Sequence, residues 1–204
     1  MPQTVDQEGN ATLVSPLHAY SVIDVTQPPR LFSVIAAVDL DGGYAKDGVI
    51  PWFYSEDLKW FKNRTENTIC VMGRTTYQDI CARLGDKALE SVLPNRTCFV
   101  VSTTLKDIKN ATVISSLGEL EKHLSPDDPR EVSVIGGGRL FREAVSKADV
   151  VFLTVINKTH ECDSFFPVKY ILNNFINTKF FKGKEEDLRY TVWQRTRRAT
   201  AYQR

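Results

Sequence analysis

Asp57 occupies an unusual place for a carboxylate, within the stretch "GVIPWFYSEDLKWFKNRT" (residues 48–65). A helix that begins at Ser55 puts Asp57 in its first turn, on the face that also carries Leu58 and Phe61. A carboxylate among apolar side chains can bind a planar, nitrogen-rich ring through paired N–H groups. Burial would raise its pKa, whereas the helix start would lower it. The plainer alternative is a first-turn acid that only interacts favourably with the helix dipole.

Two other segments place glycine between an apolar run and the start of a helical run, namely "VMGRTTY" (71–77) and "VIGGGRLF" (134–141). Glycine lets the backbone approach a ligand closely, and the free amides of a helix start bind phosphate. In the first segment Arg74 adds a positive charge and Thr76 a hydroxyl. Neither segment matches G-x-G-x-x-G or a Walker loop, and a tight packing turn would give the same pattern. Together they favour a dinucleotide ligand.

Composition excludes several classes of protein. The chain has 204 residues, 42% of them hydrophobic and 25% charged, as in an ordinary soluble domain. With 26 basic and 25 acidic residues the net charge is +1, so no broad basic surface is expected for nucleic acid or an anionic membrane. No apolar run is long enough to span a membrane, and the start lacks the pattern of a signal peptide. We therefore expect a cytoplasmic protein.

The four cysteines are expected to be reduced thiols rather than metal ligands. They form no CxxC pair, and the chain has only three histidines. Most of them lie in or beside apolar runs, which favours burial. The four are Cys70, Cys81, Cys98 and Cys162.

Apolar runs alternate with helical runs from residue 31 onward. This alternation predicts a single α/β domain with a mostly parallel, twisted central sheet, helices on both faces and a C-terminal antiparallel hairpin. Strands are expected at 31–38, 67–73, 97–103, 111–115, 131–138 and 149–157, with the hairpin inside 176–196. Helices are expected at about 55–64, 74–84, 116–124 and 139–148, with a capping box formed by Ser116 and Glu119.

The domain is expected to cover residues 30–198, between an extension at 1–29 and a tail at 199–204. In such sheets ligands bind beyond the carboxyl ends of the strands. Asp57, residues 73–76 and residues 136–138 all follow strands, so they are expected to meet along one edge.

A set of ordered motifs resembles the dihydrofolate reductases. The motifs are "SVIAAV", "IPW" ahead of "EDLKWFK", "VMGRTTY", "LPNR", "VIGGGRLF", "FLTVI" and "CDSFFP". Their order and spacing, from about Leu31 to the last strand, identify the chain as a member of this family. The resemblance implies NADPH-dependent reduction of 7,8-dihydrofolate to 5,6,7,8-tetrahydrofolate in support of one-carbon metabolism and thymidylate synthesis. It also implies a monomer that binds antifolates.

The resemblance assigns three residues to the reacting end of the substrate. Asp57 would hold the amino group and adjacent N–H of the pterin, Thr154 would hydrogen-bond that carboxylate, and Trp52 would hold an ordered water. Arg96 would pair with the glutamate carboxylate of the folate tail. The apolar walls of the folate pocket would be Ile35, Ala37, Leu58, Phe61, Ile80, Leu93 and Ile135.

The same resemblance assigns a cofactor site. Ala37, Ile50 and Phe141 would flank the nicotinamide, and Ser102 with Thr103 would contact the adenosine 2′-phosphate. The Gly136–Gly137 peptide bond would be cis. The rest of the expected set is Tyr44, Gly73, Arg74, Thr75, Thr76, Gly138, Arg139 and Leu140.

In this reaction hydride passes from the reduced nicotinamide to C6 of dihydrofolate while N5 gains a proton. The resemblance implies that Asp57 orients the ring, and that a water admitted by loop 39–54 delivers the proton. The chain departs from the family at Tyr44 and Ala45, where an aliphatic residue and glycine are usual, and in residues 83–92, an insertion expected in the lip of the pocket. The alternatives are a related pteridine or pyrimidine reductase and a non-catalytic folate- or nucleotide-binding relative.

Overall fold

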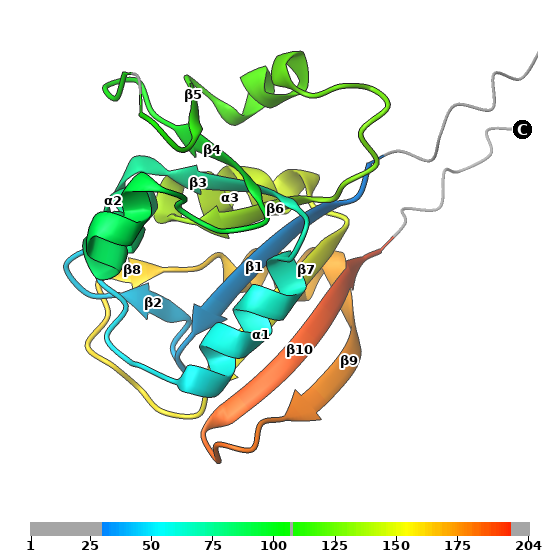
Figure 1. Cartoon of the computed structure of the whole chain (residues 1–204). Coiled ribbons are helices and arrows are strands. Elements are labelled where there is room, and N and C mark those ends of the chain that lie inside the picture. The colour runs from blue at the N-terminus through cyan, green and yellow to red at the C-terminus, as the bar shows by residue number, and fades with distance from the viewer. Residues whose placement is uncertain (1–29, 107, 197–204) are drawn as a thin grey trace, which may run out of the picture.

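The computed structural model describes residues 30–106 and 108–196, which form one eight-stranded sheet with helices on both faces (Figure 1). The expected extension 1–29 and tail 199–204 lie outside the described residues, as do residues 197–198. The helices are α1 Ser55–Thr65, α2 Arg74–Leu84, α3 Gly138–Lys147 and α4 Val168–Asn174, with 3-10 helices η2 Gly85–Leu89 and η3 Leu117–His123. The strands are β1 Phe32–Val38, β2 Gly43–Ala45, β3 Ile69–Gly73, β4 Thr97–Val101, β5 Thr112–Ile114, β6 Val132–Gly136, β7 Val150–Ile156, β8 Ser164–Phe165, β9 Phe175–Lys182 and β10 Leu188–Arg195.

The order of strands in the sheet is β5-β4-β3-β6-β1-β7-β10-β9. The strands from β5 to β7 are parallel, while β10 runs antiparallel to β7 and β9 antiparallel to β10. The predicted α/β class, parallel sheet and C-terminal hairpin are therefore confirmed. No described helix is long and apolar enough to cross a membrane.

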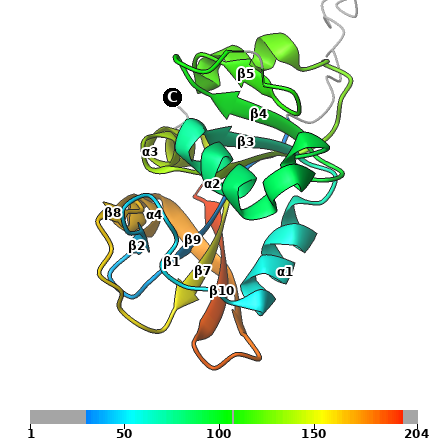
Figure 2. The same cartoon turned by 60° about the vertical axis from the view of Figure 1, so that its left-hand side comes forward.

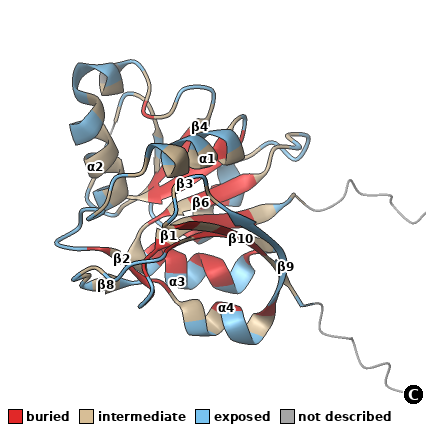
Figure 3. Ribbon diagram, turned by 90° about the horizontal axis from the view of Figure 1, so that it is seen from below, coloured by how far each residue is buried: buried red, intermediate tan, exposed pale blue. Residues whose placement is uncertain are grey.

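Alternate residues of each strand serve opposite faces of the sheet. On β1, Val34 packs into the core beneath α3, whereas its neighbour Ile35 packs with Trp60 and Phe61 of α1. Burial on both faces explains the continuous apolar strands (Figure 3). On the α1 side, α1 covers β1, β7 and β10, and α2 covers β3 and β4, so the two helices stand apart over different strands (Figure 2).

Four short elements were not expected from the sequence: β2, η2, β8 and α4. β2 and β8 pair only with each other, and their three and two residues, respectively, are too few to show a strand period. The capping-box prediction at 116–124 was wrong by one residue. Oε2 of Glu119 accepts from the amide and hydroxyl of Ser115, at 2.8 and 2.7 Å, and Ser116 makes no side-chain cap. The segment is a 3-10 helix, whose tighter winding moves the carboxylate over Ser115.

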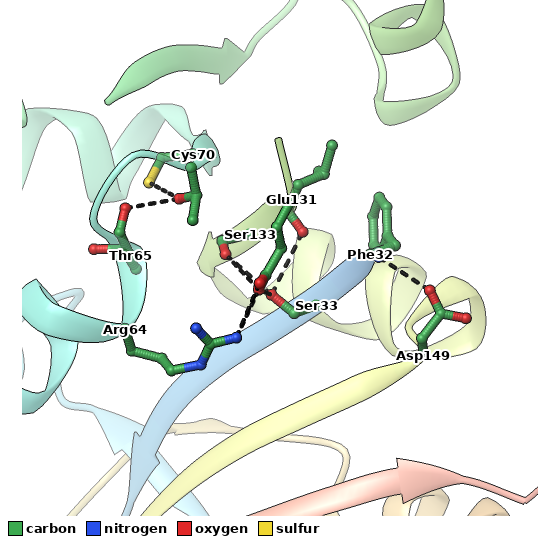
Figure 4. Close-up of polar contacts among 10 residues, drawn as sticks. Phe32, Ser33, Arg64, Thr65, Cys70, Glu131, Ser133 and Asp149 are labelled. Carbon is green, nitrogen blue, oxygen red and sulfur yellow. Dashed lines mark hydrogen bonds and ion pairs between the residues drawn. The ribbon is translucent and has the colours of Figure 1, made fainter. Parts of the chain in front are cut away.

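Glu131 joins three elements near the amino ends of β1 and β6 (Figure 4). It accepts from the hydroxyls of Ser33 and Ser133, which are 0% and 2% exposed, and from Nη2 of Arg64 at 2.9 Å. The Arg64 guanidinium also lies over the Phe152 ring, 3.8 Å from its centroid. These contacts fix the last turn of α1 to the sheet, and therefore help to set where the first turn lies.

Replacing Glu131 by alanine leaves Arg64 and two buried hydroxyls without their shared acceptor. We expect Glu131→Ala to lower the free energy of unfolding by about 2–3 kcal/mol, measured by urea denaturation. The control is Glu143→Gln, which removes an exposed i,i+4 pair with Lys147 and is expected to lower it by less than about 1 kcal/mol. Equal effects of the two substitutions would contradict the anchoring role of Glu131.

Candidate active site

A cavity of about 770 Å³ opens beyond the carboxyl ends of the parallel strands. It is formed by the loops that follow β1, β3, β4, β5 and β6, which is where the order of elements places a ligand. Its lining is rich in glycine and hydroxyl groups: Tyr44, Ala45, Gly48, Gly73, Arg74, Thr75, Thr76, Val101, Ser102, Thr103, Thr104, Ser115, Ser116, Gly137, Gly138, Arg139, Leu140, Glu143 and Ser164.

The helices α2 and α3 begin at this cavity. Among the described residues, no side chain caps the start of either helix. The residue before α2 is Gly73 and the residue before α3 is Gly137, and the first-turn amides of both helices are left to other acceptors. A Cβ built on Gly73 would lie 3.6 Å from the amide nitrogen of Gly137, so the two helix starts are neighbours. Paired helix N-termini with small residues suit the oxygens of a pyrophosphate.

The turn before α3 also requires glycine for steric reasons. Gly136 has φ +152°, and a Cβ there would lie 2.6 Å from Oγ1 of Thr76. The peptide bond between Gly136 and Gly137 is cis, as the resemblance predicted. Gly137 and Gly138, which follow this turn, line the cavity.

Positive charge and hydroxyl groups gather at the far end of the cavity, beyond β4. Nη1 of Arg74 donates to Oγ1 of Thr104 at 2.9 Å, which holds the guanidinium beside the β4 loop. Oγ of Ser102 accepts from the amides of Thr104 and Leu105, at 3.2 and 3.0 Å. This end of the cavity offers donors for a second phosphate group.

Tyr44 reaches across the cavity from β2. Its ring stands edge-on to Phe141, with centroids 5.5 Å apart, and a Cβ on Gly138 would lie 2.5 Å from its hydroxyl. Phe141 is only 3% exposed and packs against Phe166, so it lies beneath Tyr44 rather than on the cavity wall. Ala37, Ile50 and Gly136 do not line this cavity either, and Ile50 is 44% exposed on its loop.

Asp57 lies in the first turn of α1, over the carboxyl ends of β1 and β7 and the amino end of the antiparallel strand β10. Its carboxylate is hydrogen-bonded to the side chain of Thr154, which is 2% exposed. Ala37, Thr154 and Tyr190 are register neighbours on these three strands and form the floor beneath it. Burial raises the pKa of Asp57, against the hydrogen bond from Thr154, and the nearby charges of Glu185 and Glu56 raise it further. Burial therefore outweighs the hydrogen bond from Thr154.

Tyr190 is the residue at this site that sequence reasoning missed. Its hydroxyl is buried and has no hydrogen-bond partner among the described residues. Burial raises its pKa, and so does the charge of Asp57. Its position opposite Thr154 follows from the register of β10 on β7, and strand alternation in "LRYTVW" could indicate only which face it occupies.

The start of α1 is fixed by the turn between β9 and β10. The Glu56 carboxylate accepts from the amides of Lys184 and Glu185, at 3.0 and 2.9 Å, and the Glu185 carboxylate accepts from the amide of Glu56 at 3.2 Å. Trp52 packs in the same region, beside His160 and against the cluster that contains Tyr190. The segment that carries Asp57 is therefore held in place by residues outside α1.

Apolar side chains lie on both sides of the space between α1 and α2. Ile135 of β6 contacts the cluster under α1 and also the cluster under α2, so it lies between the two helices. Leu58, one residue after Asp57, is 51% exposed, and Phe53 is 73% exposed. The remaining apolar residues assigned to the pocket divide between the two sides: Ile35 and Phe61 with α1, and Ile80 and Leu93 with α2.

Arg96 lies at the opposite end of α1 from Asp57. Nη2 of Arg96 donates to the carbonyl of Lys62 at 2.5 Å, and Nε donates to the carbonyl of Thr65 at 3.2 Å. The rise of an α-helix places Asp57 and Thr65 about 12 Å apart along the axis. A carboxylate and a guanidinium so separated, with apolar walls between them, suit an elongated ligand with a polar ring at one end and an acid at the other.

The insertion at 83–92 contacts a different part of the chain from the one expected. Residues 85–89 form η2, and the side-chain amide of Asn110 donates to the carbonyl of Ala88 at 2.8 Å. A cavity of about 360 Å³ separates α2 from residues 108–110 at this point. The described part of the insertion therefore packs toward the outer strands of the sheet.

Known proteins are similar to this chain in sequence and in fold. A family model described as dihydrofolate reductase matches residues 31–197. The chain belongs to the dihydrofolate reductase family. It is 33% identical over 136 residues to dihydrofolate reductase of Haemophilus influenzae, covering 67% of this chain and 78% of that protein. It is 34% identical over 138 residues to the enzyme of Enterococcus faecium, covering 66% and 77% respectively.

A solved dihydrofolate reductase has a similar structure. The enzyme from Enterococcus faecalis, complexed with NADP(H) and RAB-propyl, superimposes with a TM-score of 0.68 at 29% identity. The match covers 81% of this chain and 96% of that one. The α/β fold and the family predicted from the sequence are therefore confirmed, while the role of each site residue stays a prediction.

The raised pKa of Asp57 has a consequence for stability. An acid with a higher pKa in the folded state than its ordinary 3.8 makes the fold less stable as pH rises through that pKa. We therefore expect Asp57→Asn to raise the free energy of unfolding of the ligand-free protein at pH 8, and the gain to shrink toward pH 4. Urea denaturation across this range measures it.

Asp187→Asn is the control with the opposite sign. Lys158 and Tyr54 lower the pKa of Asp187, so its removal is expected to lower the free energy of unfolding at neutral pH. Loss of stability in Asp57→Asn at pH 8 would contradict the raised pKa of Asp57.

Proposed function

We propose that this protein catalyses the NADPH-dependent reduction of 7,8-dihydrofolate to 5,6,7,8-tetrahydrofolate. The observation that carries the proposal is the partly buried Asp57 carboxylate, hydrogen-bonded to Thr154 at the strand edge that also bears the glycine-lined cavity. Membership of the dihydrofolate reductase family supports it.

The pteridine ring would lie between α1 and α2 with its amino group and adjacent N–H on Asp57. The N–H groups at the ring's polar edge then replace the water that burial removes from the carboxylate. The flat faces of the ring would contact the exposed side chains of Leu58 and Phe53. Thr154 holds the carboxylate in the plane of the ring. The benzoyl-glutamate tail would follow α1 toward Arg96, and antifolates with the same ring edge would bind in the same way.

The cavity beyond β3 and β6 fits a dinucleotide. Its two uncapped helix starts suit the pyrophosphate, while Arg74, Ser102 and Thr103 suit a further phosphate on the adenosine ribose. NADPH bound there would supply hydride to C6 of the substrate. Tyr44 lies over this cavity and would contact the nicotinamide half.

Catalysis by this chain would consist of placing the substrate ring against the cofactor and of stabilising the protonated ring electrostatically. Asp57 holds the ring in one orientation, and its negative charge favours the form protonated at N5. The walls around it exclude bulk water, and the loop 39–54, with Trp52, would admit the one water that brings the proton. The buried Tyr190 hydroxyl lies near Asp57 and keeps its neutral form, so it adds no negative charge.

We propose further that the protein works as a cytoplasmic monomer without nucleic-acid partners. The net charge of +1 offers no broad basic surface for nucleic acid. All four cysteines are free, which suits a reducing compartment. Cys70 and Cys98 are register neighbours on β3 and β4, and burial raises their pKa values to about 11 and about 12.

The test is NADPH oxidation by the purified protein with dihydrofolate, followed by absorbance. We expect turnover, and we expect Asp57→Asn to lower kcat/KM about 100-fold or more at neutral pH. The loss should lessen at low pH, where the substrate arrives already protonated. A folded protein that binds NADPH and antifolate without turnover would support a binding protein instead, and failure to bind antifolate would support a reductase of another pteridine or pyrimidine.

Arg74 tests the choice of cofactor. We expect Arg74→Gln to raise KM for NADPH about tenfold and to change KM for NADH by less than about twofold, because only NADPH carries the additional phosphate. Arg142→Gln, an exposed position of α3 that does not line the cavity, is the control of equal charge. Equal effects on both cofactors would show that Arg74 does not contact that phosphate.

A further inference from the structure

The tail-binding residue Arg96 already has an acidic partner within the chain. Oε2 of Glu66, the residue that follows α1, lies 3.1 Å from Nη2 of Arg96. The Arg96 side chain is 3% exposed and the Glu66 side chain 35% exposed. The carboxylate therefore covers the outer edge of a guanidinium that is otherwise enclosed by protein.

The remaining donors of Arg96 are largely taken by the backbone. Nη1 donates to the carbonyl of Pro94 and Nη2 to that of Lys62, both at 2.5 Å, while Nε faces the carbonyl of Thr65. A guanidinium has five N–H groups in a fixed plane. Nη2 also donates to Oγ1 of Thr65 at 3.2 Å, so both of its N–H groups have acceptors within the chain. An incoming carboxylate would therefore take the second N–H of Nη1, at a guanidinium that already carries the charge of Glu66.

Glu66 is held in place by a second contact. The side-chain amide of Asn95 donates to Oε1 of Glu66 at 2.9 Å, and the amide of Asn67 donates to the carbonyl of Asn95 at 3.2 Å. The two turns that carry Glu66 and Asn95 are thus joined by side chain and backbone. This arrangement keeps the Glu66 carboxylate at the guanidinium instead of leaving it free in solvent.

We propose that Glu66 is a specificity-determining residue that competes with the acidic tail of the substrate for Arg96. The inference rests on the proposed function, because it needs a folate-like ligand that extends from Asp57 to Arg96. Like charges at one guanidinium repel each other, so Glu66 weakens the binding of ligands with a tail carboxylate. It leaves the binding of the ring to Asp57 unchanged.

The test compares two ligands that differ only in their carboxylates, methotrexate and its dimethyl ester. Binding of each to wild type, Glu66→Gln and Glu121→Gln is measured by quenching of tryptophan fluorescence. Glu121 is an exposed acid on η3, so its removal changes the net charge equally. We expect Glu66→Gln to tighten methotrexate binding about three- to tenfold and to change ester binding by less than about twofold.

The ester reports the integrity of the fold and of the ring site in each variant. Weaker binding of both ligands by Glu66→Gln would show a structural role for Glu66 and overturn the inference. Unchanged or weaker binding of methotrexate, with ester binding retained, would also overturn it, since no competition would then be present. Failure of the wild type to bind either ligand would instead contradict the proposed function.

Discussion

The structure depends on the placement of one carboxylate in surroundings that disfavour its charge. Asp57 is desolvated by the sheet and by its own helix, and the hydrogen bond from Thr154 only partly compensates for that loss. The carboxylate must therefore be held by the fold, because its own solvation would draw it outward. Both ends of α1 are fixed in a way that does this, with Glu56 bound to the β9–β10 turn and Arg64 bound to Glu131.

The same helix relates the two ends of the candidate substrate site. Its first turn carries Asp57, and its last turn supplies the carbonyls that hold the Arg96 guanidinium. In the proposed function, α1 sets the distance between the carboxylate that would bind the ring and the guanidinium that would bind the acidic tail, and Glu66 lies at the guanidinium end. The glycine-lined cavity lies at the ends of β3 and β6, where α2 and α3 begin. The dinucleotide and the substrate would therefore meet at one edge of the sheet.

Sequence reasoning predicted those features that depend on local pattern. The parallel strands follow from continuous apolar runs, and the helix at Asp57 from the run that begins at Ser55. The proximity of Gly73 and Gly137 follows from the rule that strand ends share an edge, and the structure makes them neighbours. The resemblance to a family supplied the cis bond at Gly136, which no periodicity could indicate.

The features that were missed depend on contacts between distant segments. Tyr190 lies opposite Thr154 only because of the register of two antiparallel strands, and the pairing of Glu66 with Arg96 joins two turns about thirty residues apart in the sequence. The burial of Phe141, whose place beside the nicotinamide stays a prediction, likewise depends on its contacts with Tyr44 and Phe166 from other elements. Such contacts depend on how distant elements pack together, which the type and spacing of residues in the sequence do not show.

Burial disfavours the charge of the Asp57 carboxylate, and in the proposed function a protonated ring stabilises it. The most direct measurement is the ultraviolet titration of a 2,4-diaminopteridine bound to the wild type and to Asp57→Asn. We expect the ring bound to the wild type to protonate about 1–3 pH units above the free ligand, and this shift to disappear in the variant. A bound ring that titrates as it does free in solution, in both proteins, would contradict it.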